Sequence, residues 1–125
     1  MFRDPRDAYE SAVKASTSNR EIEATALSKA ARLLEECRDV WSSPGNSQRL
    51  EKALRYNQRL WTLFQTELAR PDHEMLPELR LRLLELSAFV DKRTFESIAE
   101  PRPDKLQILI DIDRNIAAGL ATRPE

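Results

Sequence analysis

Apolar residues recur every three or four positions through most of the chain, which is the spacing of one face of an α-helix. Such patterns run from Ser18 to about Trp41, from Ser47 to Arg70, from Pro77 to Ala99 and from Asp104 to Ala121. Short segments that contain proline or glycine separate them. The spacing therefore predicts four substantial helices joined by short connections.

Each pattern also predicts which positions face the interior. In the helix that ends near Trp41 these are Ile22, Ala26, Ala30, Leu33, Cys37 and Val40. In the helix from Ser47 to Arg70 they are Leu50, Leu54, Asn57, Trp61, Phe64 and Leu68. In the helix from Pro77 to Ala99 they are Leu79, Leu83, Leu86, Val90 and Ile98. In the last helix they are Leu106, Leu109, Ile110, Ile116, Ala117 and Leu120.

A shorter amphipathic stretch precedes the first of these patterns. Tyr9 and Val13 lie on one side of a helix that begins near Asp4. Ser16-Thr17-Ser18 is expected to end it, and Ser18-Asn19-Arg20-Glu21 has the form of a capping box that opens the next helix. We therefore expect a short N-terminal helix, separate from the next one and packed on or near the bundle.

Residue preference alone would favour a strand at 108–112, but no partner strand is present and the helical period continues into Ile116 and Leu120. The predicted fold class is therefore all-α. It is a compact bundle of four substantial helices plus a short N-terminal helix, with residues 1–125 forming a single domain.

The amino-acid composition and net charge limit the classes of function that we expect for this chain. Hydrophobic residues make up 41% of the 125 positions and charged residues 33%, which is typical of a folded helical domain. The formal net charge of −1 favours neither nucleic acid nor a membrane surface as a partner. Cys37 is the only cysteine, so no internal disulfide forms, and no run approaches the ~18 apolar residues of a spanning helix. With no apolar signal core after Met1, we expect a cytoplasmic protein that is not inserted in a membrane.

The sequence offers little material for catalysis. His73 stands between Asp72 and Glu74, but no second histidine or cysteine cluster completes a metal site. Only two glycines occur, which leaves no phosphate-binding loop, and no Ser/His/Asp or Cys/His arrangement is evident. We expect no enzyme, no metal, no cofactor and no small-molecule substrate, and instead a protein that binds another macromolecule.

Three residues of the stripe between Ser47 and Arg70 have two interpretations each. Asn57 is either a polar residue that specifies the core or one that recognises the backbone of a partner. Trp61 and Phe64 are either core aromatics or the lining of a groove for an amphipathic helix, bordered by this helix and the two that follow it. The helix from Pro77 to Ala99 has more apolar surface than one narrow stripe. The extra positions are Leu81, Leu84, Ala88 and Phe95.

Charged residues form two further candidate groups. Arg49, Lys52, Arg55 and Arg59 share the side of their helix opposite the apolar stripe. They form either an ordinary solvated face or, as an alternative, a face that contacts RNA phosphates.

The second charged group lies on the last two helices. Asp111, Asp113 and Arg114 occur in an apolar helix, and Lys92-Arg93 occurs late in the preceding one. An ion pair between the two helices is the structural interpretation, and partner binding through Lys92, Arg93, Asp113 and Arg114 is the functional one.

Four phrases, in this order along the chain, resemble the flagellar biosynthesis regulator family FlaF. They are Ala53–Trp61, Leu76-Pro77, Phe89–Thr94 and Ile112–Leu120. The resemblance begins near Tyr9 and extends to Leu120. Asp113 departs from it, because asparagine is expected at this position.

The resemblance implies a flagellar protein that promotes the production or export of flagellin. It further implies direct flagellin binding, in the manner of a secretion chaperone, and action opposite FlbT, a partner that represses flagellin synthesis through the flagellin messenger RNA. Two alternatives stay open: a regulator that contacts this messenger RNA, and an adaptor that binds only FlbT.

Overall fold

The computed structural model describes the backbone of residues 5–71 and 75–121 and the side chains of residues 19–71 and 75–121. This part of the chain is all-helical and contains no strand. Its four helices are α1 (Pro5–Asp39), α2 (Asn46–Leu68), α3 (Pro77–Ala99) and α4 (Pro103–Ala121). The predicted fold class and the last three predicted helices are therefore confirmed, and residues 108–112 lie inside α4.

The predicted short N-terminal helix is wrong. α1 is one continuous helix of 35 residues that passes through Ser16-Thr17-Ser18 without a break. No proline or glycine occurs between Arg6 and Ser43. Serine and threonine disfavour a helix by less than roughly 0.7 kcal/mol each, too little to end one. The side chains of Tyr9 and Val13 lie outside the described ones.

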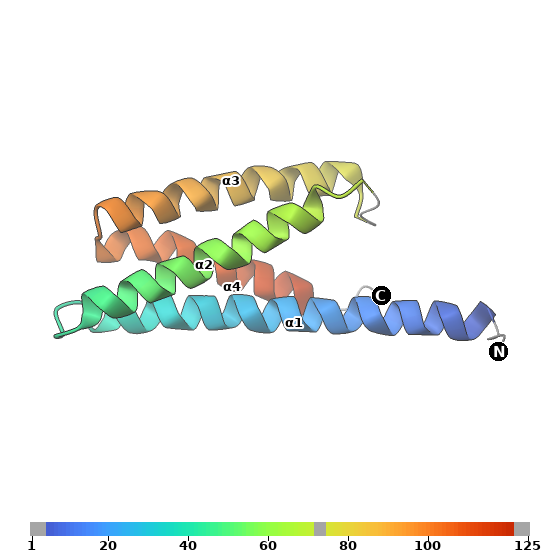
Figure 1. Ribbon diagram of the computed structural model, residues 1–125, viewed down its shortest axis with the longest axis horizontal. Helices are drawn as coiled ribbons and strands as arrows, with labels where there is room; N and C mark the ends of the chain where they lie inside the picture. The colour runs from blue at the N-terminus through green and yellow to red at the C-terminus, as the bar shows by residue number, and fades with distance from the viewer. Residues whose placement is uncertain (1–4, 72–74, 122–125) are drawn as a thin grey trace.

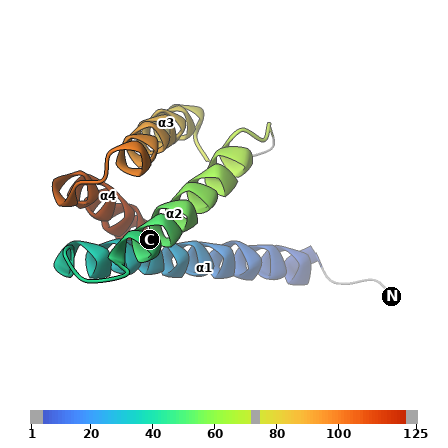
Figure 2. The same cartoon turned by 60° about the vertical axis from the view of Figure 1, so that its left-hand side comes forward.

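α1 and α3 lie on opposite sides of the bundle, and α2 crosses obliquely between them (Figures 1 and 2). α4 packs mainly along α1, whereas α3 contacts only α2 and α4. The N-terminal part of α1 extends beyond the other helices (Figure 1). α1 is thus the base of the bundle, and α3 is its outermost helix.

The turn between α1 and α2 is built around Gly45 and Asn46. Gly45 adopts φ +78°, a left-handed conformation that glycine takes without a steric penalty. The buried Asn46 amide then donates to the carbonyl oxygens of Cys37 and Trp41, each at 3.1 Å. These bonds satisfy carbonyls that the end of α1 leaves without helical partners.

The core lies where α1, α2 and α4 meet. Its largest fully buried apolar side chains are Leu27, Leu34, Leu54, Trp61, Leu106, Leu109 and Ile110. The inward stripe predicted for α2 is confirmed, with Phe64 partly buried at its edge. In the last helix the predicted stripe is confirmed as well, because Leu106, Leu109, Ile110 and Ala117 are buried and Ile116 and Leu120 pack against the core.

Two other inward faces differ from the prediction. In α1 the predicted positions Ala30 and Cys37 are buried, but the largest buried side chains are Leu27 and Leu34 of an overlapping apolar stripe. Ile22, and Val40 directly after the helix, are exposed. In α3 the predicted Val90 is buried and Leu86 and Ile98 pack against the core, but Leu79 is exposed. The other buried positions are Ser87, Thr94 and Ser97. α3 therefore packs through small residues, and much of its apolar surface faces outward.

Candidate partner-binding surfaces

A buried polar cluster joins α2, α3 and α4. Trp61 Nε1 donates to Asp113 Oδ1 at 2.9 Å, and both side chains are almost completely buried. Asn57 and Thr94 lie in the same cluster and are fully buried. The structure therefore brings together two residues predicted as partner-binding candidates on α2 and one on α4, but in the interior.

The Asn57 amide has two possible partners in this cluster. With its nitrogen turned towards Asp113, Nδ2 lies 2.6 Å from one carboxylate oxygen and 3.3 Å from the other. With the amide turned the other way, Nδ2 reaches Thr94 Oγ1 at 3.5 Å. The first orientation suits an ionised Asp113, because a carboxylate only accepts hydrogen bonds.

Asp113 is an unusual carboxyl group for a helix interior. Its pKa is raised from 3.8 to about 7, because the effect of burial exceeds the opposite effect of the hydrogen bond from Trp61. Phe64 packs edge-on against Trp61, with ring centroids 5.6 Å apart. The space among α2, α3 and α4 is thus filled by side chains, so the groove predicted there, with Trp61 as its lining, is wrong.

The predicted ion pair between the last two helices is also wrong. Arg93 pairs with Glu96 on its own helix at 3.0 Å. Arg114 instead makes two hydrogen bonds to Glu35 of α1, at 2.7 and 2.8 Å. Lys92 is exposed. Neighbouring helix positions differ by about 100° in direction, so Asp113 points inward while Arg114 points to α1.

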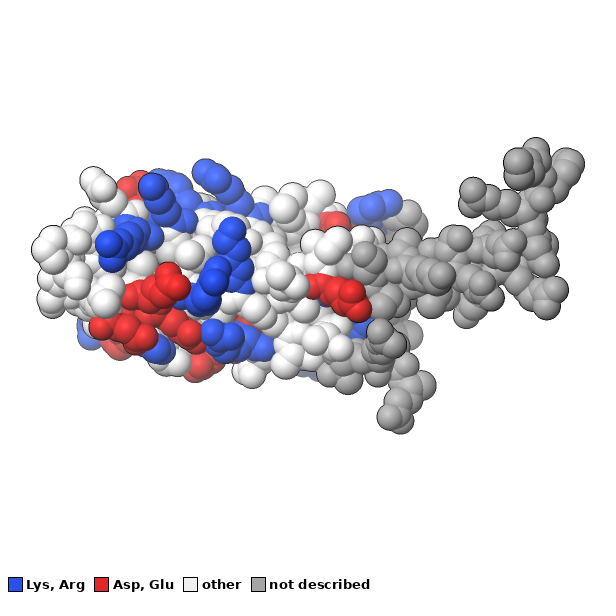
Figure 3. All heavy atoms as spheres, turned by 90° about the horizontal axis from the view of Figure 1, so that it is seen from below, with Lys and Arg blue, Asp and Glu red and all other residues white. Residues whose placement is uncertain are grey.

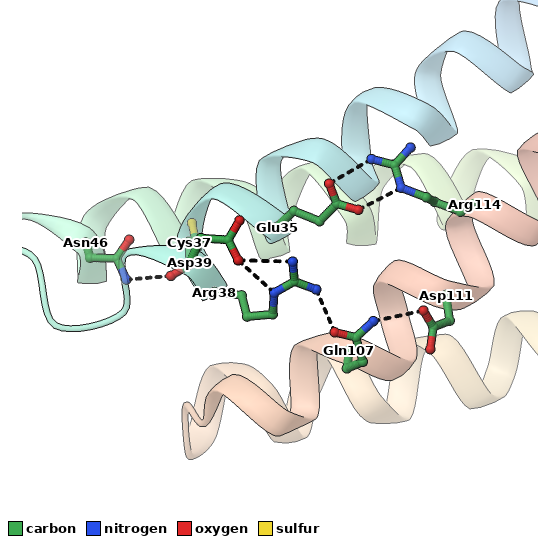
Figure 4. A network of polar contacts seen from close by, with 8 residues as sticks. All are labelled: Glu35, Cys37, Arg38, Asp39, Asn46, Gln107, Asp111 and Arg114. Carbon is green, nitrogen blue, oxygen red and sulfur yellow. Dashed lines mark hydrogen bonds and ion pairs between the residues drawn. The ribbon is translucent and has the colours of Figure 1, made fainter.

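Polar side chains link α1 and α4 along one edge (Figure 4). Besides the pair of Arg114 with Glu35, Arg38 donates to Gln107 Oε1 at 2.6 Å and pairs with Asp39. The hydrogen bonds of Arg114 hold the pKa of Glu35 below its usual range. This edge is therefore occupied by internal contacts, and Arg114 serves the packing of α4 on α1.

An open groove lies between α1 and α2, where the sequence predicted no binding groove, although several of its lining residues belong to the predicted inward stripe and basic face. Its larger hollow has a volume of about 710 Å³. The lining residues are Lys29, Leu33, Glu36, Cys37, Asp39, Val40, Arg49, Lys52, Ala53 and Tyr56. A second hollow of about 480 Å³ shares Lys29 and Tyr56 with the first and extends along α1 to Ile22. The two form one groove, which we call the α1–α2 groove.

The four cations of the predicted basic face are all exposed on α2. Arg49 and Lys52 line the α1–α2 groove, and Arg55 pairs with Glu51 at 3.6 Å. Across the groove Lys29 lies 5.1 Å from the centre of the Tyr56 ring. Basic and acidic side chains lie next to one another on the face drawn in Figure 3, so that face presents no field of a single sign.

One further acidic pair joins α1 and α2. Burial, followed by a hydrogen bond with Glu67, raises the pKa of Glu23 from 4.5 to about 7. Neither Glu23 nor the capping residue Asn46 was predicted, because both roles depend on which helices become neighbours. For Asn46, its position directly after Gly45 was the only available signal.

The sequence predicted neither a metal site nor a membrane-spanning helix in the residues that the structure describes. Among these residues no group of three or more His, Cys, Asp or Glu side chains could hold a metal ion. His73 lies outside them. No helix of the described segments is both long and apolar enough to cross a membrane. Burial raises the pKa of the Cys37 thiol.

The fold and these surfaces define an all-α bundle with a buried polar cluster and an apolar groove between two helices. The family model described as flagellar protein FlaF matches residues 5–120. The chain therefore belongs to the FlaF family and is a flagellar protein, as the four phrases predicted. Neither a curated protein nor a solved structure matches it significantly.

Proposed function

We propose that this protein binds flagellin in the cytoplasm and promotes its synthesis and secretion, like an export chaperone that acts opposite an FlbT-like regulator. Membership of the FlaF family supports the flagellar setting. The observation that carries the proposal is the α1–α2 groove, which suits an amphipathic helix of flagellin better than the filled space among α2, α3 and α4.

The dimensions and lining of the groove support a helical ligand. From Ile22 of α1 to Val40, the residue directly after this helix, the wall of the groove is about 27 Å long at 1.5 Å per residue, the length of a helix of about 18 residues. Ile22 is 63% exposed and Val40 39% exposed. Apolar side chains of this size, exposed along a continuous groove, are typical of a surface that a partner covers.

Charges at the rim indicate how such a helix would be oriented. Lys29, Arg49 and Lys52 supply positive charge, and Glu36 and Asp39 supply negative charge. Asp39 is already paired with Arg38. We therefore expect the bound flagellin helix to place acidic residues beside α2, and binding to weaken moderately as salt is added.

Titration calorimetry with monomeric flagellin tests the proposal. Replacing Ile22→Ser and Val40→Ser should each weaken binding about tenfold, because each removes roughly 1–2 kcal/mol of apolar contact. Ile108→Ser is the matched control, since Ile108 is 41% exposed on α4 and does not line the groove. Unchanged affinity in both groove variants, with folding intact, would refute the groove as the site.

A second candidate function is contact with flagellin messenger RNA, favoured by the exposed residues Arg49, Lys52, Arg55 and Arg59. RNA binding would fall steeply with salt and would collapse when these four cations are neutralised. Glu36 and Glu51 lie close to the same face and oppose a polyanion. Binding to neither flagellin nor RNA would favour an adaptor for FlbT alone.

A further inference from the structure

α3 presents an apolar stripe to solvent. Leu81, Leu84, Ala88 and Phe95 lie at successive steps of three, four and seven residues, which places them on one side of the helix. Leu81 is 57% exposed and Phe95 62% exposed. α3 is the outermost helix of the bundle and makes no contact with α1 (Figures 1 and 2).

Two opposite charges follow one edge of this stripe. Glu85 and Lys92 are both exposed and lie seven residues apart, which is two helical turns. Glu85 comes three residues before Ala88, and Lys92 comes four residues after it. This edge of α3 is therefore negatively charged on one side of Ala88 and positively charged on the other.

We propose that α3 pairs with α3 of a second copy of this chain, antiparallel and about a two-fold axis near Ala88. In this arrangement Leu81 of one copy meets Phe95 of the other, because each lies seven residues from Ala88. Glu85 of each copy meets Lys92 of the other. The small side chain of Ala88 lets the two helices approach closely at the axis.

Charge complementarity favours a second copy of this chain as the partner of α3, and it favours the antiparallel direction of the two helices. In a parallel pair the edges that carry Glu85 and Lys92 would lie on opposite sides of the interface, so these two charges would not meet across it. The antiparallel pair brings Glu85 of each copy next to Lys92 of the other, so the two charges are paired with no other partner required. One helix face buries less than the roughly 1,200 Å² of a stable interface, so the dimer is weak and depends on concentration.

Sedimentation velocity over a wide range of protein concentration tests this pairing. The unmodified chain should shift from monomer to dimer as concentration rises. Glu85→Lys and Lys92→Glu should each weaken the dimer about tenfold or more, because each creates two like-charge contacts across the two-fold axis. The double variant E85K/K92E should regain dimerisation, since it restores both attractions with reversed signs.

A matched control is Arg32→Glu, which reverses an exposed charge on α1, away from α3. It should leave the dimer unchanged. Phe95→Ser should abolish the dimer while circular dichroism shows the helices intact. Flagellin affinity of the charge variants should stay at the unmodified level, because the α1–α2 groove is untouched, so this proposal and the proposed function fail independently.

Three results would overturn the pairing. The first is a monomer at every concentration, and the second is a double charge variant that fails to regain the dimer. The third is loss of flagellin binding in Phe95→Ser without any self-association of the unmodified chain. That result would assign the stripe to flagellin instead.

Discussion

Replacing Asp113 by asparagine should stabilise the protein at neutral and alkaline pH. The folded state raises the pKa of Asp113 from 3.8 to about 7, chiefly through burial. The folded state therefore holds a proton that the unfolded state releases between these two values. The free energy of unfolding falls as pH rises through this range and stays low above it.

The size of the effect follows from the pKa change. Each pKa unit corresponds to about 1.4 kcal/mol, so the ionised carboxylate costs the fold on the order of 4 kcal/mol above pH 7. Asparagine has nearly the same shape and can still accept from Trp61 Nε1, but a neutral acceptor is weaker by roughly 1 kcal/mol. Asn57 can then turn its oxygen to the new amide and its nitrogen to Thr94.

We therefore expect Asp113→Asn to raise the free energy of unfolding by about 2–3 kcal/mol near pH 8.5 and by much less near pH 4.5. Urea unfolding followed by circular dichroism at several pH values measures the change in the free energy of unfolding at each pH. Asp111→Asn, an exposed carboxyl on the same helix, is the control and should change little. The reasoning would be refuted if the variant were less stable than the unmodified protein at every pH and its free energy of unfolding depended on pH in the same way. The ionised Asp113 carboxylate would then stabilise the folded state.

Two further predictions concern the contacts between α1 and α2. Glu67→Gln removes the acidic neighbour of Glu23, whose pKa is raised to about 7 in the folded state. In this variant less stability should be lost between pH 4.5 and 7, so the urea midpoint should depend less on pH. A urea midpoint that depends on pH as strongly as in the unmodified protein would contradict this. Asn46→Ala removes the donor to the Cys37 and Trp41 carbonyls and should cost about 1–2 kcal/mol in the same urea assay. No loss there would mean that water satisfies both carbonyls.

The fold class could be predicted from the sequence because helical periodicity and proline positions are local signals. α3 begins at Pro77, as expected for a residue that suits the first turn of a helix. The break at Ser16-Thr17-Ser18 was wrong because a capping box also occurs inside a helix when no proline or glycine interrupts it. Local signals of this kind indicate a possible start and cannot exclude continuation.

The candidate site was harder to predict, because core and groove residues share one pattern. Trp61 and Asn57 were recognised as unusual positions, but only the three-dimensional arrangement places Asp113 beside them. The α1–α2 groove depends on which of its two apolar stripes α1 buries, and the packing of α2 and α4 against α1 determines this. The sequence indicated that α3 has more apolar surface than one stripe. It did not indicate that this additional surface faces solvent.

α3 should be the least protected helix in hydrogen exchange, because it contributes the fewest fully buried apolar side chains to the core. Val90 is its only fully buried apolar side chain among the described residues. The hydroxyls of Ser87, Thr94 and Ser97 donate to carbonyls of α3 itself, at 2.7–2.8 Å, so these bonds add nothing between helices.

α1 and α4, by contrast, share a core of large aliphatic side chains, and their opening must expose that core. Exchange followed by mass spectrometry should therefore show α3 opening at a lower free energy than α4, by several kcal/mol if each buried aliphatic contributes roughly 1.5–3 kcal/mol. Raising the protein concentration should protect α3 selectively when a second copy covers its stripe. Equal protection of α3 and α4 in the dilute protein would show that the small-residue packing of α3 is stronger than its burial indicates.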